Sequence, residues 1–335
     1  MQTTTRRSLL RHGAFWGISL GAGASTLPAW SDPDTLSSLK PPALSLTEPA
    51  LYAFKIGAMD AFVIHESVIA STTVQPFFAP EGKPDEIKRL LESAFQPTDR
   101  VTLSINVLVL RDRDGVTLFD AGGNAFGSAA GRLKAGLARL GIAPEKVTNI
   151  VLTHAHGDHI AGLLNADKKS AFPNAAILIS KAEQDFWTMD NPDLSGMSAP
   201  VTDQKWVLQT ARRFLTSLKS QIKTVAFGEK IGAITVVETS GHTPGHIALS
   251  IASGADSLLV VGDAVHLFAL QFAHPEYTTA YDVAPKRAAE TRRRLFADAA
   301  KRRAKIFSYH LPFPGIGHVR ETGESYEWVP QPWTG

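Results

Sequence analysis

The segment 154–159 (HAHGDH) places three histidines and one aspartate within six residues. It follows the largely apolar run 149–152, which is typical of a buried strand. Side chains two residues apart in an extended chain point to the same side, so His154 and His156 can face one metal ion together. Asp158 and His159 then open the next segment, where an acidic residue suits the start of a helix. A strand-end loop with two groups of ligands indicates a metal site.

The other candidate ligands all follow predicted strands. His242 and His246 lie in a turn rich in glycine and proline, Asp263 follows the strand 258–261, and His310 follows the strand 306–309. A single histidine in such a place is more often a loop residue held by hydrogen bonds. Several of them on rigid strands can nevertheless meet at one sheet edge, where binding sites are commonly built.

The amino-acid composition limits which residue types can bind a metal or act as a nucleophile. The chain of 335 residues has no cysteine, which excludes disulfides, thiolate ligands and a cysteine nucleophile and leaves histidine, aspartate and glutamate to bind a metal. Its net charge of +2 is too balanced for nucleic-acid binding to be its main role. The apolar fraction of 44% and the charged fraction of 20% are ordinary for a soluble globular protein.

Periodicity predicts strands mixed with amphipathic helices from residue 51 onward. The predicted helices cover 84–95, 130–140, 207–218 and 285–305, and the predicted strands cover 61–64, 101–109, 116–119, 149–152, 175–179, 224–227, 234–238, 246–251, 258–261 and 306–309. In the last helix we expect the basic run 292–294 to form a solvated face opposite buried Leu295 and Phe296. Composition does not change after residue 50, which favours one domain.

The N-terminus carries an export pattern. Paired Arg6 and Arg7 precede the glycine-rich, weakly apolar stretch 13–23, which resembles a bacterial twin-arginine signal; a basic tail is the alternative. We therefore expect a signal peptide over 1–24, a linker over 25–49 and a catalytic domain over 50–335 in a periplasmic or secreted protein. The apolar stretch is shorter than the roughly 20 residues that a membrane span needs, so no span is expected in the mature form.

The order HAHGDH, Gly241-His242, Gly262-Asp263 and His310 resembles the metallo-β-lactamase superfamily over residues 51–335. The resemblance implies an α/β (α+β) fold, a four-layer αββα sandwich, in a single catalytic domain. Asp120, in the segment 119–122, matches the first motif of the family, a structural aspartate that supports the metal loop. The segments 280–282 and 310–318 are most similar to methyl parathion hydrolase and its lactonase relatives.

The resemblance implies a binuclear centre. One ion would be bound by His154, His156 and His242, and the other by Asp158, His159 and His310, with Asp263 bridging them and His246 giving structural support. The ions would be divalent, zinc first, with manganese, iron or cobalt as alternatives. A shared hydroxide would attack the substrate, and Asp158 would also orient it.

Substrate choice depends on fewer residues. Phe126 and Trp187 match pocket positions of the methyl parathion hydrolase group, whereas Phe186, Phe268 and Phe272 are equally explained as core or loop residues. His266 would contact a substrate carbonyl or protonate a leaving alkoxide, unless it only bonds within its loop.

We therefore expect a small uncharged substrate and no nucleic-acid partner. The expected reaction is hydrolysis of a lactone or aryl ester, with organophosphate triesterase side activity. A dedicated methyl parathion-type phosphotriesterase is the alternative. An alternative from another enzyme class is a mononuclear iron dioxygenase of the same fold, which would bind its iron with only two histidines and one aspartate. Relatives are commonly dimers, so a homodimer is compatible with this interpretation.

Overall fold

The computed structural model describes residues 49–123 and 131–332. The predicted signal peptide, nearly all of the predicted linker and Phe126 lie outside the described residues. Within the described ranges, no helix is long and apolar enough to cross a membrane.

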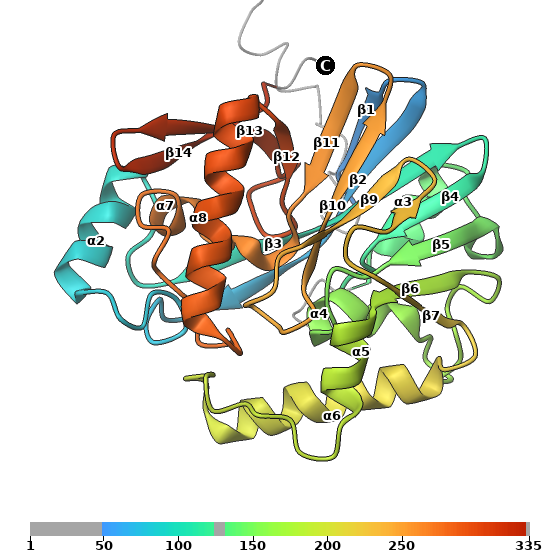
Figure 1. Cartoon of the computed structure of the whole chain (residues 1–335), viewed down its shortest axis with the longest axis horizontal. Helices are drawn as coiled ribbons and strands as arrows, with labels where there is room; N and C mark the ends of the chain where they lie inside the picture. The colour runs from blue at the N-terminus through green and yellow to red at the C-terminus, as the bar shows by residue number, and fades with distance from the viewer. Residues whose placement is uncertain (1–48, 124–130, 333–335) are drawn as a thin grey trace, which may run out of the picture. The chain divides into compact units, whose positions relative to one another are not determined.

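Two seven-stranded sheets form the centre of the fold (Figure 1). The first contains, in spatial order, β1 (Leu51–Ile56), β2 (Met59–Ser71), β3 (Val101–Asp112), β4 (Gly115–Phe119), β5 (Val147–Val151), β6 (Ala176–Ser180) and β7 (Ile222–Val225). The second contains β14 (Ser325–Pro330), β13 (Ile316–Thr322), β12 (Lys305–Phe307), β11 (Asp256–Val260), β10 (Ile247–Ser253), β9 (Ile234–Glu238) and β8 (Lys230–Ile231). Each sheet is therefore built from one half of the described chain.

Both sheets are mixed. Strands β4 to β7 run parallel to one another, as do β11 and β12, and the remaining neighbours are antiparallel. The helices are α2 (Pro84–Ser93), α3 (Leu133–Arg139), α4 (Gly157–Ile160), α5 (Lys181–Thr188), α6 (Val201–Ser217), α7 (Phe268–Gln271) and α8 (Pro285–Arg302), with 3-10 turns at Pro144–Lys146, Ala161–Leu163 and Gly262–Ala264.

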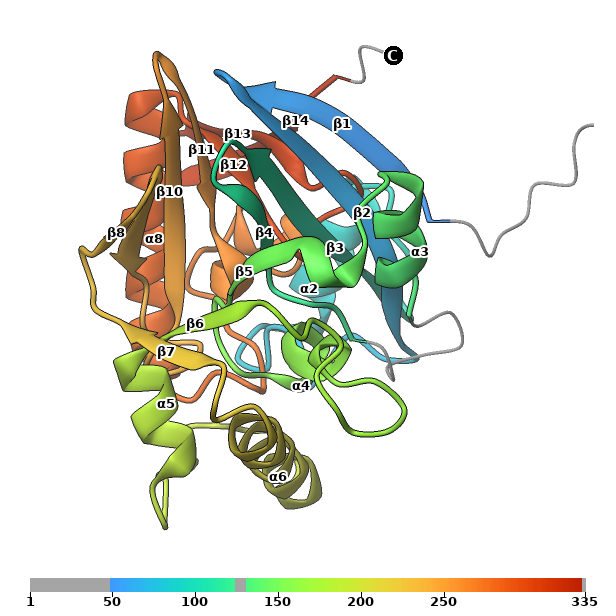
Figure 2. The same ribbon diagram turned by 90° about the vertical axis from the view of Figure 1, so that its right-hand side faces the viewer.

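The sheets pack face to face and helices cover their outer faces. Val63 and Leu108 of the first sheet share a buried cluster with Leu249 and Val260 of the second. The outer face of the first sheet is covered by α3, α5 and α6. The outer face of the second is covered by α8, which runs vertically on the left of Figure 2. The predicted four-layer αββα sandwich in one domain is confirmed, and burial of all four sheet faces explains the long apolar strands.

The predicted end of the last helix was wrong. The helix ends at Arg302, because Arg303 adopts a left-handed conformation (φ 52°) and Lys305 already belongs to β12. The hairpin of β13 and β14, which contains His318, was not predicted from the sequence.

The basic run in α8 also needs correction. Arg293 and Arg294 make exposed contacts, as expected, but Arg292 is completely buried. Its guanidinium donates hydrogen bonds to the carbonyl oxygens of Ala264, Pro275 and Tyr277. One residue of the run therefore connects α8 to the segment 264–277.

Candidate metal centre

The candidate ligands lie where strands of both sheets end. The loop after β5 carries His154 and His156 and leads into α4, at the lower centre of Figure 1. Asp158 and His159 lie in α4. The second sheet contributes His242 from the turn between β9 and β10, Asp263 after β11 and His310 after β12. The parallel strands β11 and β12 end at one edge, so Asp263 and His310 approach the loop after β5 together.

The structure brings these residues into two groups. The ligand atoms of His154, His156 and His242 lie within 4.8 Å of one another, and so do those of Asp158, His159, Asp263 and His310. Each group contains residues from both sheets. All of them are buried except Asp158, whose side chain is 16% exposed. Asp158 therefore borders the side from which a substrate can approach.

Asp263 lies between the two groups. Its Oδ1 is 3.1 Å from Nε2 of His159. Its Oδ2 is 3.3 Å from Nε2 of His310, 3.4 Å from Nε2 of His242 and 3.7 Å from Nε2 of His154. A carboxylate whose oxygens approach members of both groups has the geometry that a bridging ligand requires.

The donor set fits divalent metal ions. Nε2 of His154, His156 and His159 and Oδ1 of Asp263 are buried and have no hydrogen-bond partner among the described residues. Buried polar atoms are normally satisfied, so unpaired atoms on the residues of both ligand groups indicate a missing partner. Imidazole and carboxylate ligands suit zinc, and also manganese, iron or cobalt.

Asp120 supports the loop of the first sheet. It follows β4 with a positive φ of 61° and accepts hydrogen bonds from the backbone N–H of Thr153 at 2.8 Å and from its hydroxyl at 2.9 Å. Its Oδ2 also accepts a hydrogen bond from Nδ1 of His159 at 2.9 Å. Nδ1 therefore keeps its proton toward Asp120, and Nε2 is the nitrogen that a metal would bind. Asp263, Asp158 and Asp120 outweigh burial and raise the pKa of His159, so a metal would displace the proton of Nε2.

The second-sheet ligands have their own supports. Nδ1 of His242 donates to Asp282 at 2.7 Å, and Nδ1 of His310 donates to the carbonyl oxygen of Ser104 at 2.9 Å. His246 does not face the ligand groups; its Nε2 accepts a hydrogen bond from the backbone N–H of Asp263 at 3.0 Å.

Sequence reasoning missed three of these supporting residues. Asp282 lies in a segment singled out only for its resemblance, and Ser104 acts through its backbone. Tyr309 precedes His310; its ring stacks on His159 at 3.9 Å between centroids, and its hydroxyl donates to the carbonyl oxygen of Asp158 at 2.9 Å. The position of Tyr309 beside a ligand was the only available signal.

Charges within the centre separate the histidines into two kinds. Burial lowers the pKa of His154 and His156, so both offer neutral rings. Burial acts in the same direction on His310, but Asp263 and Asp158 outweigh it and raise the pKa of His310 to about 9. Without metal, His310 is therefore protonated at neutral pH.

We expect zinc binding at pH 7 to release protons. An ion must displace the proton of His310, which Asp158 and Asp263 hold in the metal-free protein. The apparent zinc affinity should therefore rise as the pH increases from 6 toward about 9. Calorimetric titrations at pH 7 in two buffers of different ionisation enthalpy should give different heats; identical heats would contradict the assignment.

The predicted pocket residues occupy different places. Trp187 is fully buried; its ring contacts His156 with 5.7 Å between centroids, and its indole N–H donates to Glu183. Its predicted place in the substrate pocket stays a prediction. Phe186 and Phe272 belong to hydrophobic clusters. Phe268 lines a small cavity of about 80 Å³ together with His266 and His310.

A pair of aromatic rings that the sequence reading did not assign to the pocket lies beside the centre. Tyr281 precedes Asp282 and stacks on Phe77 with 6.1 Å between centroids and parallel planes. Both side chains are half-buried. Burial, Asp203 and Asp158 raise the pKa of Tyr281, so its hydroxyl stays neutral and Asp158 is close enough to act on it.

His266 contacts Asp263 directly. Its Nε2 lies 3.0 Å from Oδ2 of Asp263, whose carboxylate can only accept, so Nε2 carries the proton. Burial lowers the pKa of His266, which keeps the ring neutral. Its Nδ1 is consequently an acceptor, and it has no partner among the described residues.

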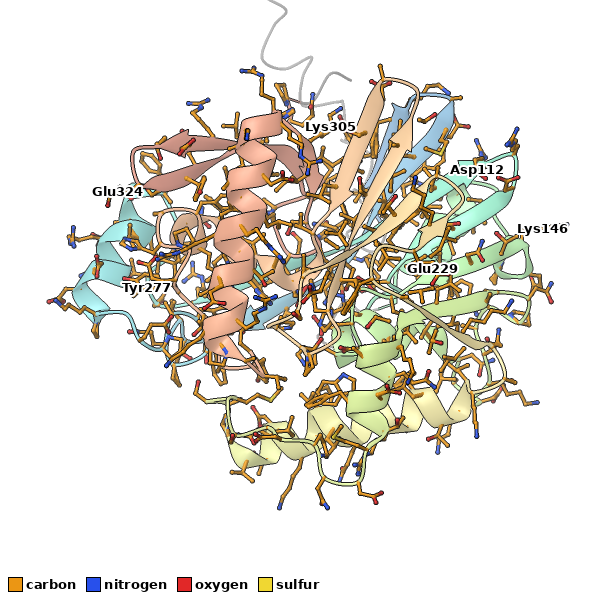
Figure 3. All side chains as sticks on the ribbon, in the orientation of Figure 1. Asp112, Lys146, Glu229, Tyr277, Lys305 and Glu324 are labelled. Atoms are coloured by element: carbon orange, nitrogen blue, oxygen red, sulfur yellow. The ribbon has the colours of Figure 1, made fainter. Side chains whose placement is uncertain are left out.

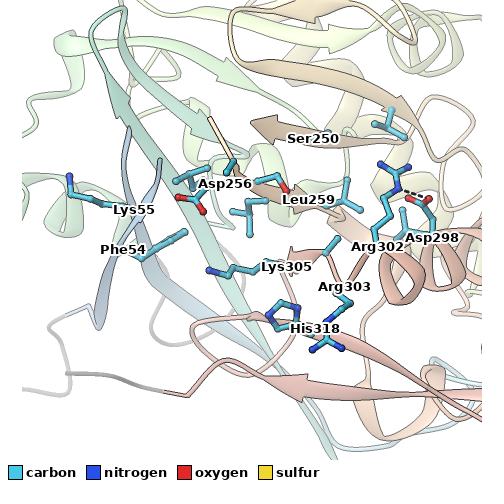
Figure 4. A pocket seen from close by; sticks show the side chains of 17 residues that line it. Phe54, Lys55, Ser250, Asp256, Leu259, Asp298, Arg302, Arg303, Lys305 and His318 are labelled. Atoms are coloured by element: carbon cyan, nitrogen blue, oxygen red, sulfur yellow. Dashed lines mark hydrogen bonds and ion pairs between the residues drawn. The ribbon is translucent and has the colours of Figure 1, made fainter. Parts of the chain in front are cut away.

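A further cavity lies away from the ligands. It has a volume of about 600 Å³ and is lined by residues that include Lys55, Asp256, Arg303, Lys305 and His318 (Figure 4). Asp256 and Lys305 begin the strands β11 and β12, whose other ends lead to Asp263 and His310. Lys305 is labelled at the end of the molecule opposite α6 in Figure 3. This groove is therefore distinct from the metal centre.

Comparisons with known proteins agree with this geometry. The family described as the metallo-beta-lactamase superfamily matches residues 100–310. The structure of AidC, a dizinc quorum-quenching lactonase in complex with a product, N-hexanoyl-L-homoserine, is 27% identical with a TM-score of 0.82 over 86% of this chain and 99% of that chain. The structure of hydrolase AbOPH, in the beta lactamase superfamily, is 31% identical with a TM-score of 0.77 over 85% of this chain and 98% of that chain.

A relative in Bacillus subtilis (strain 168), the uncharacterized protein YobT, is 31% identical over 163 residues. The match covers 49% of this chain and 63% of the Bacillus protein. The chain thus spans less than two thirds of this relative.

Proposed function

Since the chain belongs to the metallo-beta-lactamase superfamily and is a metal-dependent hydrolase, we propose that it opens the ring of N-acylated lactones with two zinc ions. The observation that carries the proposal is the pair of ligand groups around Asp263. The likeness to the dizinc lactonase AidC over 86% of the chain supports it.

Each residue has a defined part in this proposal. His154, His156 and His242 would hold one ion, Asp158, His159 and His310 the other, and Asp263 both. When bound, the ions would lower the pKa of a shared water and polarise the substrate carbonyl. Asp158, the only ligand with appreciable exposure, would orient the attacking water through its second oxygen.

The free acceptor on His266 favours an N-acylated lactone over a phosphotriester. Nδ1 of the neutral ring can accept a hydrogen bond from the amide N–H of the acyl group, a donor that a simple phosphotriester lacks. This role differs from the predicted contact with a carbonyl oxygen, which needs a donor. The half-buried pair Phe77 and Tyr281 would pack against the apolar part of the substrate.

A substrate panel on zinc-saturated protein tests the proposal. We expect kcat/KM for N-acyl homoserine lactones to exceed that for aryl esters and for methyl parathion-type triesters by about tenfold or more, a difference of about 1.4 kcal/mol. Elemental analysis should give two zinc ions per chain. A preference for the triester would contradict the proposal, and one iron with dioxygenase activity would favour the mononuclear alternative.

A His266→Phe variant adds an internal control to the panel. Loss of the acceptor should lower kcat/KM for N-acylated lactones about tenfold, the cost of about one hydrogen bond. The rate with γ-butyrolactone, which has no amide, should change much less. Equal losses on both lactones would exclude His266 as the residue that recognises the amide.

A further inference from the structure

The carboxylate of Glu183 contacts the first ligand loop. Glu183 lies in the first turn of α5 and is fully buried. Its Oε1 accepts a hydrogen bond from the backbone N–H of Ala155 at 2.9 Å, and Ala155 lies between His154 and His156. The same oxygen accepts a hydrogen bond from the indole of Trp187 at 2.6 Å, and the edge of that indole packs on His156. One carboxylate oxygen is thus committed to this loop.

The other oxygen of Glu183 contacts the loop of the second sheet. Oε2 accepts hydrogen bonds from the hydroxyl of Thr243 at 2.6 Å and from the backbone N–H of Gly245 at 3.0 Å. Thr243 directly follows His242, and Gly245 lies three residues after it. Ser180, the N-cap of α5, also donates to the carbonyl oxygen of Gly245. The start of α5 therefore connects the two loops that supply the three-histidine group.

The contact between α5 and the second loop leaves no space for a side chain at Gly245. A Cβ atom on Gly245 would lie 2.0 Å from the backbone nitrogen of Glu183 and 2.4 Å from its Cα. Any other residue at position 245 would push the loop away from the helix. Helix and loop are therefore in direct backbone contact at the point where Glu183 binds both loops.

The second ligand group is supported elsewhere. His159 is held by Asp120, and His310 is held by the carbonyl oxygen of Ser104. The side-chain hydrogen bonds of Glu183 in the described structure go only to Ala155, Trp187, Thr243 and Gly245. A change at Glu183 should therefore act on one group and spare the other.

We propose that Glu183 is a positioning residue that fixes the separation between the 154–156 loop and the 242–245 turn, and so controls the affinity of the three-histidine group for its metal ion. The inference rests on the proposed two-metal function. Replacement by glutamine keeps the shape of the side chain but turns one acceptor oxygen into a donor nitrogen, which leaves two of the four buried donors without an acceptor.

The test is a zinc titration of the metal-free full chain against a chelator of known affinity. Wild-type protein should bind two zinc ions in resolvable steps. In Glu183→Gln, one step should weaken by about 10- to 100-fold, the usual effect of losing a residue that orients ligands, while the other stays unchanged. A His242→Ala variant identifies the step that belongs to the three-histidine group.

Glu66→Gln is the matched control. Glu66 is also buried, and its carboxylate accepts hydrogen bonds from the backbone N–H groups of Gly123 and Gly131, neither of which is next to a candidate ligand. Both zinc steps should therefore keep their wild-type affinities. Equal weakening of the two steps in Glu183→Gln, or of the same step in Glu66→Gln, would overturn the inference and assign Glu183 a general structural role.

A milder variant covers the case in which Glu183→Gln does not fold. Thr243→Val removes one donor to Glu183 and keeps the carboxylate, so it should weaken the same step to a smaller extent; unchanged titrations would overturn the inference. Fewer than two zinc ions on wild-type protein would instead overturn the proposed two-metal function. Two normal steps in both Glu183→Gln and Thr243→Val would overturn only the role of Glu183.

Discussion

Replacing Asp263 with alanine is expected to lower kcat/KM by roughly 10³-fold or more, equivalent to about 4 kcal/mol of lost transition-state stabilisation. Among residues 49–123 and 131–332, Asp263 is the one whose carboxylate approaches members of both ligand groups, with Oδ1 toward His159 and Oδ2 toward His242 and His310. Its removal would weaken the binding of both ions. The positive charges of the two ions would also face each other without a carboxylate between them.

Metal content and activity should fall together in Asp263→Ala. Elemental analysis after desalting should find fewer than two zinc ions per chain, and excess zinc should not restore the full rate. His318→Ala is a suitable control, because His318 lies in β13 and lines the distant groove. A variant with two zinc ions and more than about a tenth of the wild-type kcat/KM would show that Asp263 is not a bridging ligand.

Replacing Arg292 with alanine is expected to lower the free energy of unfolding by about 3–5 kcal/mol, the usual cost of breaking a buried charged interaction on one side. The guanidinium of Arg292 donates to three carbonyl oxygens at 2.6–2.7 Å. Burial lowers its pKa, although Asp282 favours the charged form. Alanine would leave a cavity and remove the side-chain donor from the carbonyls of Ala264 and Pro275, whereas the carbonyl of Tyr277 would keep its hydrogen bond from Gln271.

The neighbouring Arg293→Ala variant is the control for this experiment. Arg293 is 58% exposed and pairs with Glu276 at 2.8 Å, so its loss should cost about 0–1 kcal/mol. Urea unfolding of chelator-treated protein, followed by circular dichroism, measures both variants without the contribution of bound metal. Similar losses of unfolding free energy in the two variants would contradict a stabilising role for the buried hydrogen bonds of Arg292.

The first ligand loop was predictable because its information is local. Strand periodicity and the spacing of HAHGDH fix which side chains share a side, and the structure groups His154 with His156 and Asp158 with His159. The supports could not be predicted in this way. His242 bonds Asp282 across 40 residues, and His310 bonds Ser104 across 206, and no pattern within either segment encodes such a distance.

Arg292 shows a second limit of sequence reading. The apolar stripe of α8 correctly predicted that Leu295 and Phe296 are buried. Helical periodicity also assigns each arginine an angle around the helix axis. It does not show that three backbone carbonyl groups lie within hydrogen-bond distance of Arg292. Those carbonyls belong to Ala264, Pro275 and Tyr277, in an irregular segment whose conformation depends on the folded contacts themselves.

The division of the ligands between the sheets has a consequence for assembly. Residues 51–225 build one sheet and residues 230–330 the other, and each ligand group takes members from both. Each bound ion would therefore act as a cross-link between the two halves of the chain. An ion present at about 100 times its dissociation constant adds about 2.7 kcal/mol to the folded state. A chelator would therefore reduce the stability of the packing between the two sheets and also abolish catalysis.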